Sequence, residues 1–414
     1  METNLSEYPG RNPIAPITGS ATKEMTEVDF WHPDDTIIMN QDEIDEYNQY
    51  LEEQGNIGVV NMLKLPHNIS RAQLIEMITS GQSFEDTVYL ADEKVTPAEL
   101  KDLVDAQALE AIPDMVTAIC ALTSAPADMR YYPTTKAGTG DGRFISEKCI
   151  DQFQGTQLTL AEPILIYHVS EDKKWYFARS RNYMGWVKRI CVAICPRGIW
   201  EDYILSPRFA IVTEHKACDV LGVKMKLYVG TKIAMDMDGN LRIPTRTIDG
   251  SIRFVNTVLD INMHQGYLPY TTRNVITQAF KLLGDQFGWG GKYGYSDCSG
   301  TVNAVYGCFG FNLPRDTKDL RKIKRHAIDR TGVIDYNSVQ PGSLLLCPGH
   351  VMIYLGMHDG KAYGFHGLAS ILDDNGELLD LYRVEVSNID LIRSETGRTY
   401  EQDTVLIVEI KSNK

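Results

Sequence analysis

The sequence predicts an α+β protein of several domains, ordered along the chain as a helical region, two runs of short strands and a mixed C-terminal part. Three observations predict this class. The chain has 414 residues, which is more than a single hydrophobic core usually holds. Apolar residues follow a helical period up to about residue 124, and from there to about residue 264 they alternate with polar residues as in strands. Beyond residue 264 both patterns occur.

The N-terminal region, residues 1–124, is predicted to be a tail followed by helices. Three stretches have helical periodicity: DEIDEYNQYLEEQ, ISRAQLIEMITSG and TPAELKDLVDAQALEAI. Ser70 opens the second, and Thr96 with Pro97 opens the third, as N-cap residues and first-turn prolines do at helix starts. We predict no chemistry for this region.

Residues 125–195 and 196–264 are each predicted to form a small β-barrel. In the first, QLTLAEPILIYHVS, KKWYFARSR and MGWVKRICVAI alternate apolar and polar residues. In the second, RFAIVTEHKA, KMKLYVGTKIAMDMDGNLRIPTR and GSIRFVNTVLDI do the same, and MDGNL carries the Asp-Gly pair of a tight hairpin. Cys191 and Cys195 are expected in the strand core, because no second Cys/His pair at ligand spacing accompanies them.

Composition limits the partners. The net charge is 41 − 55 = −14, which argues against nucleic acid or an anionic membrane surface as the main partner. No apolar run approaches the length of a membrane span, and the N-terminus lacks the features of a signal peptide. We therefore expect a cytoplasmic protein if Met1 is the native start, and a periplasmic or cell-envelope protein if a leader has been removed. No cofactor and no metal are expected, and the eight cysteines form no dense disulfide framework.

The C-terminal part, residues 265–414, contains a cysteine in an unusual setting. In GWGGKYGYSDCSG, residues 288–300, Cys298 follows a glycine-rich loop and precedes TVNAVYGCFGF, which has helical periodicity. Unpaired N–H groups and the helix dipole at a helix start lower the pKa of a thiol and favour the reactive thiolate. The backbone N–H of Cys298 is also a candidate oxyanion donor. Cys298 is therefore predicted to be a nucleophile.

Two histidines are candidates to serve this thiol. A thiol nucleophile needs a general base, usually a histidine that a third polar group orients. His350 heads the apolar strand GHVMIYLG, and His366 lies on the next predicted strand, in AYGFHG. Antiparallel pairing would set the two imidazoles side by side, so we predict His350 as the base and His366 as its orienting residue. His358 is expected in solvent at the hairpin tip.

Asp297 precedes the thiol and needs its own explanation. Its negative charge opposes formation of the thiolate. A cationic group of the ligand as its partner would explain it, and so would a role as N-cap of the following helix. Both remain open at the level of sequence.

The segments GWGGKYGYSDCSGTVNAVY, LPRDT, GSLLLCPGHVMIYLG and AYGFHG resemble the NlpC family of papain-like cysteine peptidases, and the order Cys, His, third polar residue is that family's order. The pattern WYFARS…YMGWV resembles bacterial SH3-like domains. HQGYLPYTTRNVITQAFKLLG is similar to a subgroup with an N-terminal helical domain and two SH3-like domains. The resemblance thus implies a papain-like α+β domain at 265–414, SH3-like domains at 125–195 and 196–264, and a helical domain within 1–124.

The resemblance also implies an activity. Enzymes of this family cleave peptidoglycan stem peptides, commonly between γ-D-glutamate and a diamino acid such as meso-diaminopimelate. In the SH3-like subgroup the first SH3-like domain narrows the cleft, so substrates need a free N-terminal L-Ala. Cys298, His350 and His366 would be the catalytic residues. Asp297 and Tyr183 would hold the ammonium group, Ser299 would line its pocket, and Arg315, Asp316 and Thr317 would form the cleft wall, with Thr317 where the family usually has Ser.

Two other readings compete with peptide hydrolysis. One is a non-catalytic cell-wall binding protein, and the presence of both Cys298 and His350 argues against it. The other is an amidase or acyltransferase with the same thiol chemistry, which needs the same residues. The identity of the diamino acid, and whether the role is wall remodelling or peptide recycling, are left open by the sequence.

Overall fold

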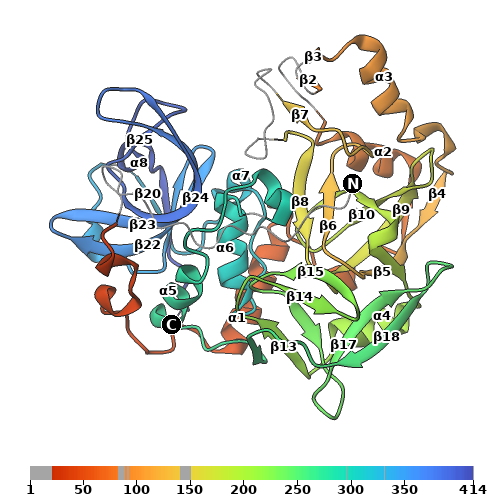
Figure 1. Cartoon of the computed structure of the whole chain (residues 1–414), viewed down its shortest axis with the longest axis horizontal. Helices are drawn as coiled ribbons and strands as arrows, with labels where there is room; N and C mark the ends of the chain where they lie inside the picture. Colours follow the sequence, from red (N-terminus) through yellow and green to blue (C-terminus); the bar gives the residue numbers. More distant parts are fainter. Residues whose placement is uncertain are drawn as a thin grey trace.

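The structure is a computed structural model of the chain and describes residues 21–82, 89–90, 93–139, 151–294, 296–330 and 332–413. The strands of the C-terminal domain lie on one side of the molecule, and the strands between residues 119 and 265 lie on the other (Figure 1). Between them lies helix α6 (Cys298–Gly307), the helix that begins at the predicted nucleophile.

Three helices of the N-terminal region begin where the sequence predicts helices. They are α1 (Gln41–Glu53), α2 (Arg71–Thr79) and α3 (Pro97–Asp105). Each starts at a capping box, in which the N-cap side chain and the side chain three residues later each accept from the other's backbone N–H. The N-caps are Asn40, Ser70 and Thr96, so the starts predicted at Ser70 and Thr96 are confirmed.

These helices do not share a core of their own among the described residues. Helix α1 packs into the core of the C-terminal domain through Ile44, and the Asn48 side-chain amide donates to the carbonyl of Gly310 at 2.8 Å. Helix α2 packs through Leu74 into the core of the strands that follow it. Helix α3 packs through Leu103 against residues of the same strand region. The predicted helical domain is therefore distributed over three cores, because each helix has only one apolar stripe to bury. This region also contains short paired strands. Strand β1 (Asn68–Ser70) pairs with β4 (Met115–Thr117), and β2 (Tyr89–Leu90) pairs with β3 (Glu93–Lys94) and with β7 (Gly138–Thr139).

The first β-domain is one antiparallel sheet of seven strands. In sheet order these are β12 (Val192–Ile194), β5 (Ile119–Thr123), β9 (Pro163–Val169), β10 (Trp175–Arg179), β11 (Met184–Lys188), β6 (Ala127–Arg130) and β8 (Gln154–Leu158). Strand β5 lies before the boundary predicted at residue 125, so the sheet begins inside the region predicted as helical.

The second β-domain follows helix α4 (Arg197–Ile204) and consists of three small sheets. These are β16 (Lys232–Ala234) with β13 (Phe209–Val212) and β19 (Met263–Gln265), β14 (Lys216–Val220) with β15 (Val223–Leu227), and β17 (Leu241–Arg246) with β18 (Ile252–Thr257). The predicted turn at MDGNL is confirmed, since Met235 pairs with Leu241 across it and Gly239 has a positive φ of 86°. Trp186 of the first β-domain and Ile233 of the second belong to the same core, so the two β-domains form one packed unit.

The C-terminal domain is a mixed α+β layer structure, as predicted. Its antiparallel sheet runs β20 (Ala327–Asp329), β26 (Leu406–Val408), β21 (Leu344–Cys347), β22 (His350–His358), β23 (Lys361–Leu372) and β24 (Leu378–Asn388), with β25 (Ile392–Arg393) also paired to β23. Helices α5 (Thr272–Phe280) and α6 pack on one face of the sheet through Val275 and Val305. The other face carries Tyr354 and the short helix α8 (Tyr400–Asp403).

In the described part of the chain, none of the helices combines the length and the apolar character that a membrane crossing requires. The described cysteines are all free thiols, while Cys149 lies outside the described residues. Cys195 is buried in the core that the two β-domains share, where the sequence places it, and Cys191 is half-buried.

Candidate active site

The predicted nucleophile is the first residue of helix α6. Asp297 is the N-cap, and its Oδ1 accepts from the backbone N–H of Gly300 at 2.5 Å, which confirms the N-cap interpretation. The preceding loop turns at Gly290, Gly291 and Gly294, whose φ values of 61°, 73° and 75° lie in the left-handed region that glycine adopts without strain. The sequence therefore predicted both the helix start and the glycine-rich loop before it.

The two predicted histidines are in direct contact. Strands β22 and β23 are antiparallel, with Ile353 opposite Phe365. His350 Nε2 and His366 Nδ1 are 2.8 Å apart, and His366 Nε2 is 2.8 Å from the Ser387 hydroxyl on strand β24. The ring of Tyr400 lies against both imidazoles, at centroid distances of 5.0 and 5.1 Å. The result is a buried chain of three polar side chains across three strands.

This chain fixes the tautomers if His350 is to act as a base through Nδ1. The proton of His350 must then lie on Nε2 and is donated to Nδ1 of His366. His366 must in turn carry its proton on Nε2 and donate it to the Ser387 hydroxyl oxygen. Burial lowers the pKa of His366 to about 3, so His366 stays neutral and remains an acceptor. The pKa of His350 also lies well below 6.5, first through burial and then through repulsion by His366 and Arg393.

The thiol lies at the start of strand β22. The backbone N–H of Val351, the residue after His350, donates to Cys298, and the Cys298 Sγ is 3.8 Å from the Thr317 hydroxyl. Gly367, the residue after His366, permits this approach: a Cβ there would lie 3.3 Å from the carbonyl carbon of Asp297. The fold thus brings the thiol at the start of helix α6 close to the start of the strand that carries His350.

The protonation state of the thiol differs from the sequence expectation. A helix start favours the thiolate, but burial and the neighbouring Asp297 carboxylate raise the pKa of Cys298 to about 11. The resting pair is therefore a neutral thiol and a neutral imidazole. A neutral pair needs His350 to take the proton as the sulfur attacks.

Asp297 already has a cationic partner within the chain. The Arg315 guanidinium donates to Asp297 Oδ2 at 2.6 Å, to Ser299 Oγ at 2.9 Å, and to Thr156 Oγ1 of the first β-domain at 2.7 Å. All four side chains are buried. The structure thus joins three predicted substrate residues in one internal network, and the expectation that Asp297 awaits a ligand cation is not needed to explain it.

Tyr183 and Asp316 form a second group, at the junction with the first β-domain. The hydroxyls of Tyr183 and Tyr131 are 2.6 Å apart, and a Cβ at Gly155 would overlap the Tyr183 ring at 2.3 Å. The pKa of Tyr183 is raised, first by burial and next by the Asp316 carboxylate. Burial also raises the pKa of Asp316 itself, and its ion pair with Lys318 spans 3.6 Å, which is longer than a hydrogen bond.

Both β-domains hold the glycine loop in front of the nucleophile. The Lys292 ammonium contacts the Asp151 carboxylate, which also pairs with Arg130 at 2.9 Å, and all three are buried. Burial, which raises the pKa of Asp151, is outweighed by the two cations, so its pKa is lowered. From the second β-domain, Lys226 donates to the carbonyl of Gly294 at 2.5 Å.

Replacing Lys292 by methionine should therefore weaken both the fold and the site. We expect a loss of about 2–4 kcal/mol in the free energy of unfolding, somewhat below the ~3–5 kcal/mol typical of a broken buried pair because Arg130 remains. Turnover per folded molecule should also fall, by about 100-fold if the loop moves by ~1 Å. Urea unfolding and kcat on the same preparation measure both effects. The control is Lys101→Met. The Lys101 side chain is 71% exposed and pairs with Asp105 on the surface, so this variant should behave as wild type. A Lys292→Met variant with wild-type stability and turnover would contradict this role.

Sequence reasoning missed several residues of the site. Ser387 and Tyr131 have no local signal, except that Tyr131 begins the pair YYP directly after strand β6. Lys292 stands inside the quoted glycine motif, but its partner Asp151 lies 141 residues away in the chain. Pairs so distant in sequence become visible only when the fold brings them together.

Comparisons with known proteins find two related domains and one related peptidase. A model of the NlpC/P60 family matches residues 284–404, which include Cys298, His350 and His366, and a model of an SH3 domain of the SH3b1 type matches residues 146–188. That the second β-domain is also SH3-like remains a prediction from the sequence. Dipeptidyl-peptidase 6 of Lysinibacillus sphaericus is 36% identical over 208 residues, covering 47% of this chain and 74% of that protein.

One solved structure shares the fold over nearly the whole chain. An NlpC/P60 endopeptidase from Photobacterium damselae subsp. piscicida aligns with a TM-score of 0.71 at 17% identity, over 91% of this chain and 92% of that chain. An NlpC/P60 family protein from Bacillus cereus ATCC 10987 aligns with a TM-score of 0.48 at 14% identity, over 70% of this chain and 99% of that chain. The likeness to the first structure extends over nearly the whole chain and so includes the β-rich parts as well as the C-terminal domain.

Proposed function

Since this chain belongs to the NlpC/P60 family of cysteine peptidases, we propose that it hydrolyses peptidoglycan stem peptides between γ-D-glutamate and a diamino acid, in peptides with a free N-terminal L-Ala. The observation that carries the proposal is the buried chain from His350 through His366 to Ser387, with the Cys298 thiol at the helix start beside it. Such an arrangement activates a thiol toward an amide carbonyl.

The proposed reaction proceeds through an acyl-enzyme. Cys298 Sγ attacks the carbonyl carbon of the scissile amide while its proton passes to Nδ1 of His350. The backbone N–H of Cys298, the first residue of helix α6, stabilises the oxyanion. The C–N bond then breaks as His350 returns the proton to the leaving amine. Water, deprotonated by His350, cleaves the thioester and releases the acid together with the free thiol.

The proposed ammonium pocket contains Asp316 and Tyr183. The substrate ammonium needs an acceptor that the protein has left weakly paired, and Asp316 meets this condition better than Asp297. Asp297 is bonded to Arg315 and to the N–H of Gly300, whereas the only ion pair of Asp316 in the described part of the chain is the 3.6 Å contact with Lys318. The side chain of Asp316 is 27% exposed, so a ligand has access to it.

The test compares L-Ala-γ-D-Glu-diaminopimelate with its N-acetylated form. In wild type, acetylation should lower kcat/KM by roughly 30- to several-thousand-fold, since a buried charge that loses its partner costs about 2–5 kcal/mol. Asp316→Asn should act mainly on the free peptide and so reduce this preference. Asp297→Asn should slow both peptides alike, because Asp297 holds Arg315.

The matched control is Asp319→Asn. Asp319 lies on the short helix α7 (Thr317–Leu320), of which Asp316 is the N-cap, and its carboxylate pairs with Lys322 at 2.6 Å. This variant should retain the wild-type preference for the free amine. Equal rates of wild type on the free and the acetylated peptide would refute the ammonium pocket. Mass spectrometry of the products should show the dipeptide acid and free diaminopimelate, and a product in which an added amine is acylated in preference to water would indicate acyl transfer instead.

A further inference from the structure

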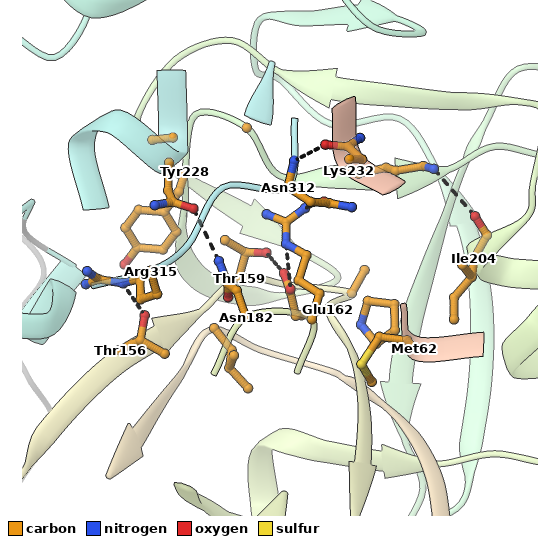
Figure 2. Close-up of a pocket in the computed structure, with 18 of the residues that line it drawn as sticks. Met62, Thr156, Thr159, Glu162, Asn182, Ile204, Tyr228, Lys232, Asn312 and Arg315 are labelled. Atoms are coloured by element: carbon orange, nitrogen blue, oxygen red, sulfur yellow. Dashed lines mark hydrogen bonds and ion pairs between the residues drawn. The ribbon is translucent and has the colours of Figure 1, made fainter. Parts of the chain in front are cut away.

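A large cavity lies where several parts of the molecule meet. It has a volume of about 610 Å³ and is lined by α1, by both β-domains, by the end of α4 and by the side of α6 that faces them (Figure 2). Pockets of about 300–1,000 Å³ are typical of small-molecule sites in proteins. Chain segments that meet only in the tertiary structure therefore surround a space of ligand size.

The cavity is separate from the candidate active site. Cys298, His350 and His366 are not among the residues that line it. Arg315 and Asp297, the residue before the nucleophile, form part of its wall, and their ion pair is buried. A molecule in this cavity would occupy a second site and not the catalytic cleft.

Lys232 of the second β-domain extends into the cavity with few acceptors around it. Among the described residues its ammonium has one hydrogen bond, a long one of 3.5 Å to the carbonyl of Ile204 (Figure 2). Its Nζ lies 4.3 Å from the Phe209 ring centroid and 5.6 Å from that of Tyr267. Burial and repulsion from Arg181 lower the pKa of Lys232 to about 8, against the opposing attraction of the Asp45 carboxylate. An ammonium group carries three donors, so most of its capacity is unused by the described chain.

Arg181 is the second cation at this cavity. It donates to Asn312 Oδ1 at 3.0 Å, while its buried Nε has no hydrogen bond to any residue that the structure describes and lies 3.7 Å from Glu162 Oε1. Lys232 and Arg181 repel each other, and a negative group near both would remove that repulsion.

Three carboxylates of the lining each accept a hydrogen bond of 3.2 Å or less, whereas the one bond of Lys232 among the described residues is 3.5 Å long. Glu162 accepts from the Thr159 hydroxyl at 3.0 Å, Asp45 from the Gln41 amide at 3.1 Å, and Glu52 from the Asn61 amide at 3.2 Å. The protein thus supplies donors to its acids in this cavity but few acceptors to Lys232. This asymmetry favours an anionic ligand over a cationic one.

We propose that this cavity is a ligand site for a small organic carboxylate, whose negative charge is held by Lys232 and Arg181. The aromatic rings of Phe209 and Tyr267 hold the ammonium in place, and the cavity accepts the carbon skeleton. The proposal does not rest on peptidase activity.

The test is calorimetric titration of the Cys298→Ala variant, which cannot turn over a peptide, with acetate, glutarate and L-glutamate. Glutaramide, which has the shape of glutarate without its charges, is the uncharged comparison. We expect saturable 1:1 binding of at least one of the carboxylates. Glutaramide should bind about 10- to 100-fold more weakly than glutarate, as expected for loss of a charge-assisted hydrogen bond.

Variants locate the site. Lys232→Met in the same background should lose affinity by about 10-fold or more, and Arg181→Gln should lose it independently. Lys224→Met, at an exposed position of strand β15 in the same β-domain, should bind as the parent does. Circular dichroism and the Tm verify that each variant is folded. Absence of saturable binding for all three carboxylates, or equal binding by the Lys232→Met and Lys224→Met variants, would overturn the proposal.

Discussion

Replacing Cys298 by alanine should abolish hydrolysis of the stem peptide and leave the fold intact. The thiol is the only group placed to form the covalent intermediate among the described side chains around His350, so kcat should fall by roughly five to six orders of magnitude, as when a catalytic triad loses its nucleophile. Steady-state kinetics with mass-spectrometric detection measures the loss. An unchanged Tm shows that the fold is retained. A turnover rate of Cys298→Ala within ten-fold of the wild-type rate would show that Cys298 is not the nucleophile.

The pH dependence of the same site follows from the two pKa shifts. Because the pKa of His350 lies well below 6.5, its imidazole remains a base at acidic pH, and the acid limb of kcat/KM should have its midpoint below 6.5. Because the pKa of Cys298 is raised to about 11, its alkylation by iodoacetamide without substrate should keep accelerating above pH 9. An alkylation rate that is already maximal near pH 6 would instead indicate a preformed thiolate–imidazolium pair.

The second large effect is expected for His350→Ala. Loss of the base should reduce kcat nearly as much as loss of the thiol, and the double variant should be no slower than either single one, since residues that act as a unit are not additive. Steady-state rates of the three variants on one peptide measure this. Strictly additive losses would mean that His350 and Cys298 act separately.

His366 provides the comparison on the neighbouring strand. His366→Ala should cost less, about 10²–10⁴-fold, because the base is still present but its tautomer and orientation are no longer fixed. His366→Asn, which retains an acceptor for His350 Nε2–H, should recover part of the loss. His358, 37% exposed at the hairpin beside Asp359, is the control and should be dispensable. An essential His358 with a dispensable His366 would show that the wrong histidine had been assigned.

The sequence by itself determined the features that depend on neighbouring residues. Helix starts at Ser70, Thr96 and Asp297 follow from side chains that bond backbone N–H groups three residues on. His350 and His366 stand on two consecutive strands joined by a tight hairpin, so their closeness follows from the local order of the strands, although a β-bulge between Tyr354 and Gly356 shifts the exact register. Both kinds of feature are local, so the pattern of a short segment is enough to predict them.

Only the tertiary structure decided which charges meet. Asp297 is paired with Arg315, which also donates to Thr156 of the first β-domain. Because Asp297 is already paired, we propose Asp316 as the acceptor of the substrate ammonium. The raised pKa of Cys298 likewise comes from burial by segments distant in sequence, and burial outweighs the helix start. Electrostatic effects depend on distance and dehydration in space, which a linear pattern does not encode.

The same reason explains why the domain boundaries predicted from the sequence differ from the hydrophobic cores of the structure. Periodicity shows that α1 has an apolar stripe, but it does not show that this stripe is buried in the C-terminal domain. Nor does it show that Lys292 meets Asp151, or that Lys232 and Arg181 face one cavity. The local conformations were determined by the sequence. The partners, such as Lys292 and Asp151 at 141 residues apart, were decided by tertiary packing, because burial and charge pairing depend on which surfaces meet.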